Sequence, residues 1–116
     1  MDQKRRRELL WEYRNRKPEM GILSYLCVAT GESFLGISRE TRADINSNRM
    51  KLTTNWHPNK ALQALWNRYG EEGFQVTVEV LPYDEKEDKQ DYTKELEELL
   101  AKCLDRDEKS HRLYLR

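Results

Sequence analysis

The chain has 116 residues, equal numbers of acidic and basic side chains, and 36% charged residues. This length suits one domain built around one hydrophobic core. The longest nearly uninterrupted apolar stretch, residues 21–29, is too short to span a bilayer, and no signal-peptide apolar region follows the basic start. We therefore expect a cytoplasmic protein that contacts no membrane.

The charges are unevenly distributed along the sequence. Residues 1–17 carry seven basic and three acidic side chains, whereas residues 81–116 carry eight basic and eleven acidic ones. A basic leading segment can contact phosphates, although a solvated, arginine-rich helix face has the same composition. The candidate nucleic-acid-binding residues are Lys4, Arg5, Arg6, Arg7, Arg14, Arg16 and Lys17.

The first part of the sequence predicts a helix followed by a β-hairpin. Residues 3–16 carry apolar side chains at helical spacing, and Pro18 stops the helix. Residues 20–28 and 33–37 are rich in β-forming side chains. The four residues between them include Gly31, which suits a tight turn that needs a positive φ.

The middle of the sequence predicts two further helices. Thr41 and Asp44 fit a capping box at the start of a short helix that runs to about Met50. Pro58 suits a first helical position and Gly70 suits a C-terminal stop, with an apolar helix face between them.

The last part predicts a strand, a loop and a helix. Residues 74–80 alternate between apolar and polar side chains, which indicates a strand with one buried face. A charged loop, residues 84–91, precedes an amphipathic helix from about Tyr92 to Leu104. We therefore expect an α/β (α+β) domain with a small three-stranded antiparallel sheet flanked by helices. The expected division is an N-terminal basic helix at 1–17, the domain at 18–104 and a charged tail at 105–116.

Two tripeptides in the expected hairpin resemble the paired motifs of the GIY-YIG endonuclease family. Gly21-Ile22-Leu23 stands where the family has Gly-Ile-Tyr, and Phe34-Leu35-Gly36 stands where it has Tyr-Ile-Gly. The separation of the two motifs and the order of later helices and strands are also similar, over about residues 20–104. The resemblance implies a GIY-YIG nuclease-like fold with an extra N-terminal helix.

The resemblance also implies a set of catalytic groups. In that family, the two tyrosines lie on adjacent strands beside the scissile phosphate, and the next helix supplies an arginine that neutralises phosphate charge. A later helix supplies a glutamate that holds a divalent metal. Phosphodiester hydrolysis needs such an activated nucleophile, cationic charge and metal. An active member would therefore use a metal such as Mg²⁺.

Most of this set is substituted here. The tyrosine positions hold Leu23 and Phe34, and neither side chain can accept a proton. The arginine position falls on Asp44, which reverses the charge. The metal-binding glutamate matches Glu97 best. Register alternatives are Glu95 and Glu98, and all three are also typical of an exposed helix face.

Three other residues are candidates to replace the missing groups. His57 could act as a base, although a histidine before a helix is more often a capping or packing residue. Tyr25 shares a strand face with Leu23 and could place a hydroxyl near the site, although a core tyrosine has the same pattern. Arg42 lies close to Asp44, but residues two apart on a helix point in nearly opposite directions.

The sequence leaves three functions open. The favoured one is a catalytically impaired nuclease-like domain that binds DNA weakly and in a salt-dependent way, or acts as an accessory protein. The second is a divergent metal-dependent DNA endonuclease that uses Glu97 for the metal. The third is a protein-interaction module without a nucleic-acid role, which the zero net charge favours because duplex binders usually have a basic face.

Overall fold

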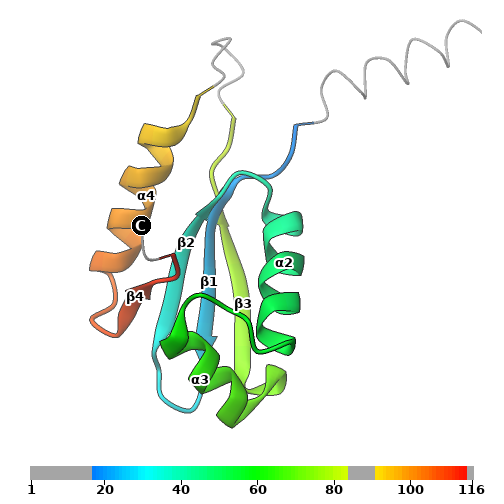
Figure 1. Cartoon of the computed structure of the whole chain (residues 1–116). Coiled ribbons are helices and arrows are strands. Elements are labelled where there is room, and N and C mark those ends of the chain that lie inside the picture. The colour runs from blue at the N-terminus through cyan, green and yellow to red at the C-terminus, as the bar shows by residue number, and fades with distance from the viewer. Residues whose placement is uncertain (1–16, 84–90, 115–116) are drawn as a thin grey trace, which may run out of the picture.

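The structure, a computed structural model, describes residues 17–83 and 91–114. Within these ranges a four-stranded sheet is flanked by three α-helices (Figure 1). The predicted N-terminal helix and most of the charged loop lie outside the described residues. The elements are β1 (Gly21–Cys27), β2 (Ser33–Ser38), α2 (Thr41–Thr53), α3 (Lys60–Tyr69), the 3₁₀ turn η1 (Glu71–Gly73), β3 (Phe74–Val80), α4 (Thr93–Asp105) and β4 (Ser110–Arg112).

The predicted hairpin is confirmed as β1 and β2. The two strands pair antiparallel, with Leu23 opposite Gly36 and Tyr25 opposite Phe34. Gly31 in the connecting turn has a φ of 78°, which glycine adopts without the steric cost of a Cβ atom. The hairpin therefore places the two motifs on neighbouring strands.

The predicted third strand is also confirmed, as β3, but its burial differs from the prediction. β3 pairs antiparallel with β1 and forms one edge of the sheet. Phe74 is buried, whereas Val76 and Val80 are exposed. The expectation of a strand with one buried face is wrong for most of β3, because the helices cover this edge strand less completely than the central strand β1.

The two faces of the sheet have separate cores. Successive strand residues point to opposite faces. Leu23 and Phe34 pack with apolar residues of α2 and α3, whereas Ile22 and Leu35 pack with Leu100 of α4. Helices α2 and α3 therefore cover one face, and α4 covers the other (Figure 1).

Helix α2 starts differently from the prediction. It is longer than expected and ends at Thr53, and no side chain caps its N-terminus. The predicted capping box is wrong: the Thr41 hydroxyl donates to the Glu19 carboxylate at 2.7 Å, and Asp44 accepts a hydrogen bond from the Ser38 hydroxyl. Both side chains make tertiary contacts that local spacing does not show.

Helix α3 begins two residues later than the prediction. Pro58 lies before the helix, and Asn59 is the N-cap, with its side chain accepting a hydrogen bond from the Leu62 amide at 3.1 Å. An asparagine oxygen satisfies an amide that the first helical turn leaves free. Gly70 ends the helix with a φ of 71°, which confirms the predicted stop.

The C-terminal residues include a short strand that the sequence does not predict. Strand β4 pairs parallel with β2, so the sheet has four strands, in the order β3-β1-β2-β4, and not three. Leu113 is buried in the same core as Leu23, and its amide donates to the Leu35 carbonyl at 2.8 Å.

Every helix of the described chain is too short or too polar to cross a bilayer.

Candidate functional site

The two motif positions lie side by side in the core. Leu23 and Phe34 occupy adjacent strands on the same face of the sheet, as the sequence predicts, and Phe34 is opposite Tyr25, two residues along β1 from Leu23. They are 0% and 1% exposed. Neither side chain carries an ionisable group, and neither reaches the surface of the molecule.

The C-terminal segment covers the second motif. The His111 ring packs on Phe34 with ring centroids 5.2 Å apart. The Tyr114 ring lies so close to Gly36 that a Cβ atom on this glycine would come within 2.8 Å of it. His111 Nε2 also lies 3.2 Å from the Glu32 carboxylate, which holds the segment against the hairpin. The protein's own side chains therefore fill the space beside the second motif.

Buried polar side chains link α2 to the loop before α3. Asn48 donates to the Tyr114 hydroxyl at 3.1 Å, and its carbonyl oxygen lies 2.9 Å from His57 Nε2. The backbone amide of Asn59 donates to His57 Nδ1 at 3.0 Å. Because Nδ1 is an acceptor, the proton of the neutral ring is on Nε2, which donates to Asn48. Both nitrogens of His57 are therefore occupied.

The surroundings of His57 disfavour its protonated form. Burial lowers the pKa of His57, and the nearby positive charge of Lys51 lowers it further. The ring is buried, and both of its nitrogens are hydrogen-bonded. A general base needs a free lone pair within reach of the proton that it removes. In this structure His57 has the geometry of a hydrogen-bonded packing residue.

Tyr25 is buried in the same region. Its hydroxyl lies beside Asn48, Tyr114 and Asp44, without a well-formed hydrogen bond among the described residues. Burial raises the pKa of Tyr25 to about 12. A phenol with this pKa keeps its proton at neutral pH, so Tyr25 is poorly suited to activate water.

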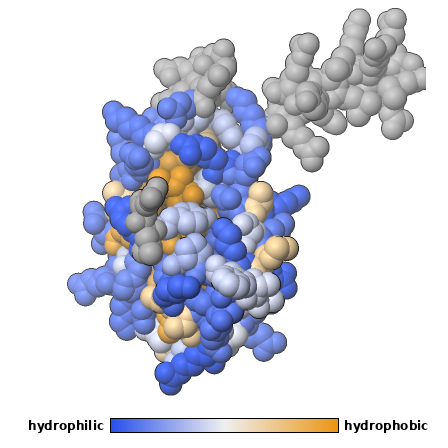
Figure 2. Space-filling view, viewed as in Figure 1, coloured by the Kyte–Doolittle hydropathy of each residue, from blue (hydrophilic) through white to orange (hydrophobic). Residues whose placement is uncertain are grey.

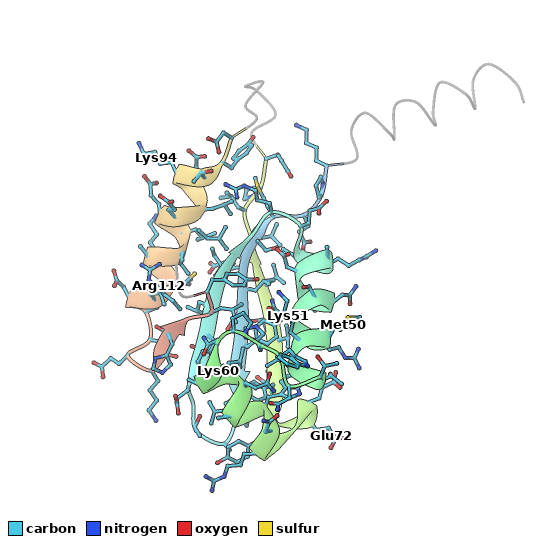
Figure 3. The ribbon with its side chains drawn as sticks, in the orientation of Figure 1. Met50, Lys51, Lys60, Glu72, Lys94 and Arg112 are labelled. Carbon is cyan, nitrogen blue, oxygen red and sulfur yellow. The ribbon has the colours of Figure 1, made fainter. Side chains whose placement is uncertain are left out.

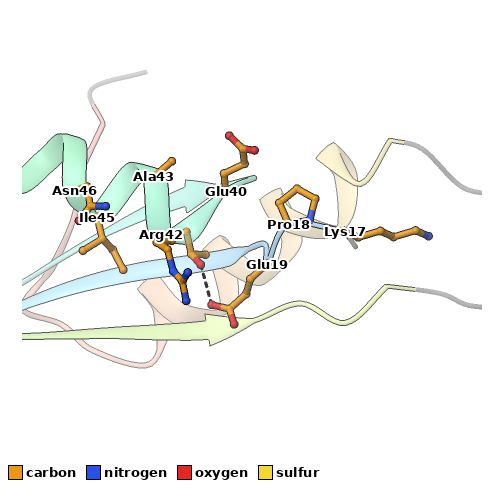
Figure 4. A pocket seen from close by; sticks show the side chains of 9 residues that line it. Lys17, Pro18, Glu19, Glu40, Arg42, Ala43, Ile45 and Asn46 are labelled. Atoms are coloured by element: carbon orange, nitrogen blue, oxygen red, sulfur yellow. Dashed lines mark hydrogen bonds between the residues drawn. The ribbon is translucent and has the colours of Figure 1, made fainter. Parts of the chain in front are cut away.

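Asp44 and Arg42 point in different directions, as their spacing predicts. Asp44 hydrogen-bonds to Ser38 and faces the sheet. Arg42 is exposed and lines a hollow of about 900 Å³ at the start of α2 (Figure 4). The same hollow contains Lys17 and Glu19, so its charges are mixed. The structure therefore does not bring Arg42 to the motif positions.

Glu97 does not join these residues either. It is exposed on α4, and α4 packs on the face of Ile22 and Leu35, opposite the face of Leu23 and Phe34. Among residues 17–83 and 91–114, no group of three or more His, Cys, Asp or Glu side chains is arranged to share a metal ion. The residues around the motif positions therefore do not fit a divalent metal.

The basic segment lies almost entirely outside the described residues. Of its seven cations only Lys17 is described, and its ammonium group lies 5.0 Å from the centre of the Tyr83 ring. The positions of Lys4, Arg5, Arg6, Arg7, Arg14 and Arg16 therefore remain predictions from the sequence.

The structure also shows residues that the sequence did not single out. Asn48 and Tyr114 connect the C-terminal segment to α2, and Trp56 is exposed in the loop before α3. The signal for Trp56 was present: it is an aromatic residue in a polar loop, outside any apolar periodicity. No local signal marks Asn48 or Tyr114, because their partners are distant in sequence.

Two solved structures have a similar fold. The catalytic domain of the homing endonuclease I-TevI matches 75% of this chain and 86% of that chain, with a TM-score of 0.60 and 16% identity. A mutant of the catalytic domain of the intron endonuclease I-TevI matches 59% and 70%, with a TM-score of 0.51 and 19% identity. The fold is similar to a GIY-YIG nuclease domain. No protein-family model matches this chain, and no curated protein has a significantly similar sequence.

Proposed function

We propose that this nuclease-like domain binds DNA without cleaving it. One observation carries the proposal: Leu23 and Phe34, which the resemblance assigns to the family's two tyrosine positions, are buried, and His111 of the C-terminal segment packs on Phe34. A nuclease must expose its reactive groups to the phosphate backbone. Here the corresponding surface is closed by protein side chains.

The surrounding groups also oppose cleavage. Asp44 places a negative charge near the Tyr25 hydroxyl, which disfavours additional negative charge on a phosphate there. Tyr25 keeps its proton because burial raises its pKa, and both ring nitrogens of the buried His57 are occupied by hydrogen bonds. Glu97 lies across the sheet, so a metal bound there would be remote from Leu23 and Phe34. No candidate replacement is placed where the missing group would act.

The distribution of charge supports binding to DNA. Residues 1–17 carry a net charge of +4. On the described surface, α2 and α3 together carry five basic residues and one acidic residue, whereas α4 carries two basic and four acidic residues. A polyanion is attracted to the side of α2 and α3 and repelled by α4.

The test is a DNA-binding titration of the full chain at several salt concentrations. If about four cations contact phosphates, the slope of log affinity against log salt is near −3 to −4. A variant that combines Lys4→Gln, Arg5→Gln, Arg6→Gln and Arg7→Gln should lose most of this slope. The matched control, Lys94→Gln with Lys102→Gln on α4, should keep it. An absence of binding even at low salt would leave the protein-interaction module as the better account.

A further inference from the structure

Trp56 is exposed to an unusual degree. Its side chain is 79% exposed, whereas Trp66 is 8% exposed and packs on Phe74 with ring centroids 5.3 Å apart. An indole ring left in water forfeits the free energy that its burial would provide. A large aromatic side chain in this situation is a candidate contact for a partner.

Hydrogen bonds fix the backbone of the loop that carries Trp56. The Trp56 amide donates to the Lys51 carbonyl at 2.8 Å, and the His57 amide donates to the Gln63 side-chain oxygen at 3.0 Å. Gln63 is buried, and its side-chain amide donates to the Leu52 carbonyl at 2.9 Å. These hydrogen bonds tie the loop to both helices that it connects, so Trp56 is presented on a defined backbone.

The residue before Trp56 adds a second constraint. Asn55 has a φ of 63°, in the left-handed region, which asparagine adopts more often than most residues other than glycine. Its side-chain oxygen accepts a hydrogen bond from Asn67 of α3 at 3.0 Å. This conformation, stabilised by α3, sets the direction in which the chain enters Trp56.

Basic side chains stand at both ends of this loop. Lys51 is in the last turn of α2, beside the 70% exposed Met50, and Lys60 begins α3 (Figure 3). Neither lysine forms an ion pair within residues 17–83 and 91–114, whereas Arg49 pairs with Glu71. Two lysines and an exposed indole therefore occupy one short segment.

We propose that Trp56 stacks on an unpaired base of DNA while Lys51 and Lys60 contact the adjacent phosphates. An aromatic platform beside cations is the combination by which proteins bind single strands, because every base has a face on which to stack. A base in an intact duplex cannot reach the indole in this way. The inference rests on the proposed function and specifies the form of DNA: a strand with unpaired bases.

The surroundings favour DNA over a protein partner. Trp and Met are enriched in protein–protein interfaces, but lysine is depleted there and is common against phosphates, so Lys51 and Lys60 are the residues that favour DNA. The view in Figure 2 shows a mostly hydrophilic surface with apolar side chains in small patches. That face offers no broad apolar area of the kind that stable protein interfaces bury.

The experiment compares a labelled single-stranded oligonucleotide that does not fold on itself with the blunt-ended duplex that it forms with its complement, using the full chain. Trp56→Ala should weaken single-strand binding by roughly 5- to 150-fold and leave duplex binding unchanged. Trp56→Phe should retain most of the affinity because it keeps a ring. Val80→Ala, an exposed apolar residue on β3, is the matched control and should bind like the wild type.

The lysines are tested separately by the salt dependence of binding. Lys51→Gln combined with Lys60→Gln should reduce the magnitude of the single-strand salt slope by about 1 to 1.5, since each phosphate contact on a single strand contributes about 0.7. Lys94→Gln, on α4 across the sheet, is the control and should leave the slope unchanged (Figure 3).

The outcomes separate this inference from the proposed function. If the wild type binds DNA and Trp56→Ala binds the single strand equally well, the stacking role is wrong and the proposed function stands. An equal loss on single strand and duplex would also contradict stacking. If the wild type binds neither form of DNA at low salt, the proposed function itself fails, and the inference fails with it.

Discussion

The ring of Tyr114 lies directly against Gly36, the glycine of the second motif. A Cβ atom on Gly36 would come within 2.8 Å of two ring carbons of Tyr114 and within 3.0 Å of the Leu113 Cβ. Side-chain atoms do not approach this closely without displacement. In this protein the glycine has a structural use, because it makes room for the segment that covers the motif positions.

We therefore expect Gly36→Ala to lower the free energy of unfolding by about 1–3 kcal/mol, as overpacking does in other cores. Denaturant unfolding measures this loss. The same substitution in a Tyr114→Ala background should cost clearly less, because the ring that it strikes is gone. An equal cost in both backgrounds would show that the contact between Gly36 and Tyr114 is not the cause.

Gly21→Ala should be more damaging than Gly36→Ala. A Cβ atom at position 21 would lie 2.1 Å from the Glu79 carbonyl oxygen, so the obstacle is the backbone of β3. We expect a loss of at least about 3 kcal/mol in the free energy of unfolding. Gly70→Ala is the comparison, because its Cβ atom meets no atom within 4 Å and its cost comes from the backbone, whose φ of 71° and ψ of 176° are adopted almost only by glycine. If Gly70→Ala proved the costlier change, the clash would not be the dominant effect.

The stability of the fold should depend on His57 below neutral pH. Its pKa is lowered in the folded state from the ordinary value of 6.5, so the unfolded chain binds this proton more tightly. The contribution is fully present above about pH 6.5 and is lost as the pH falls through the folded pKa, by up to about 1.4 kcal/mol per pH unit.

Unfolding measured from pH 8 down to pH 4 tests the role of His57. The wild type should show this loss, whereas His57→Gln should give a flatter curve. His111→Gln removes the other, exposed histidine and should keep the His57 contribution. The assignment to His57 would be wrong if the His57→Gln and wild-type curves were parallel.

Asn59 should stabilise the fold in two separable ways. Its side-chain oxygen caps α3, and its side-chain amide nitrogen donates to the backbone carbonyls of Arg112 and Leu113, each at 3.1 Å. Asn59→Ser keeps a capping hydroxyl but is too short to reach the C-terminal segment. Asn59→Ala loses both functions and should be less stable than Asn59→Ser by about 1 kcal/mol. Equal stabilities would mean that the cap contributes nothing measurable.

Much of the sheet was predictable, because its signals are local. Gly31 marks the turn, and the period-two pattern of residues 74–80 marks β3. Strand β4 was not predictable, because three residues carry no pattern and their pairing depends on the edge of β2. The burial of Leu113 has the same origin, since it follows from a partner that is distant in sequence.

The site was predictable only in part. The hairpin predicted that Leu23 and Phe34 are neighbours on paired strands, as the register shows. The placement of Glu97 did not, because an amphipathic helix pattern shows which side of the helix is buried but not which face of the sheet it covers. The hydrogen bond of Asp44 with Ser38, which replaces the predicted cap, was not predictable either, because Ser38 lies outside the helix.

The most direct test of the account is an assay of DNA cleavage. The full chain is incubated with supercoiled, linear and branched DNA in Mg²⁺ and in Mn²⁺, under salt conditions at which binding is observed. We predict binding without nicking, because the side chains at positions 23 and 34 cannot activate water and Glu97 lies across the sheet from them. Metal-dependent nicking that is lost in Glu97→Ala but retained in the control Glu108→Ala would contradict the account.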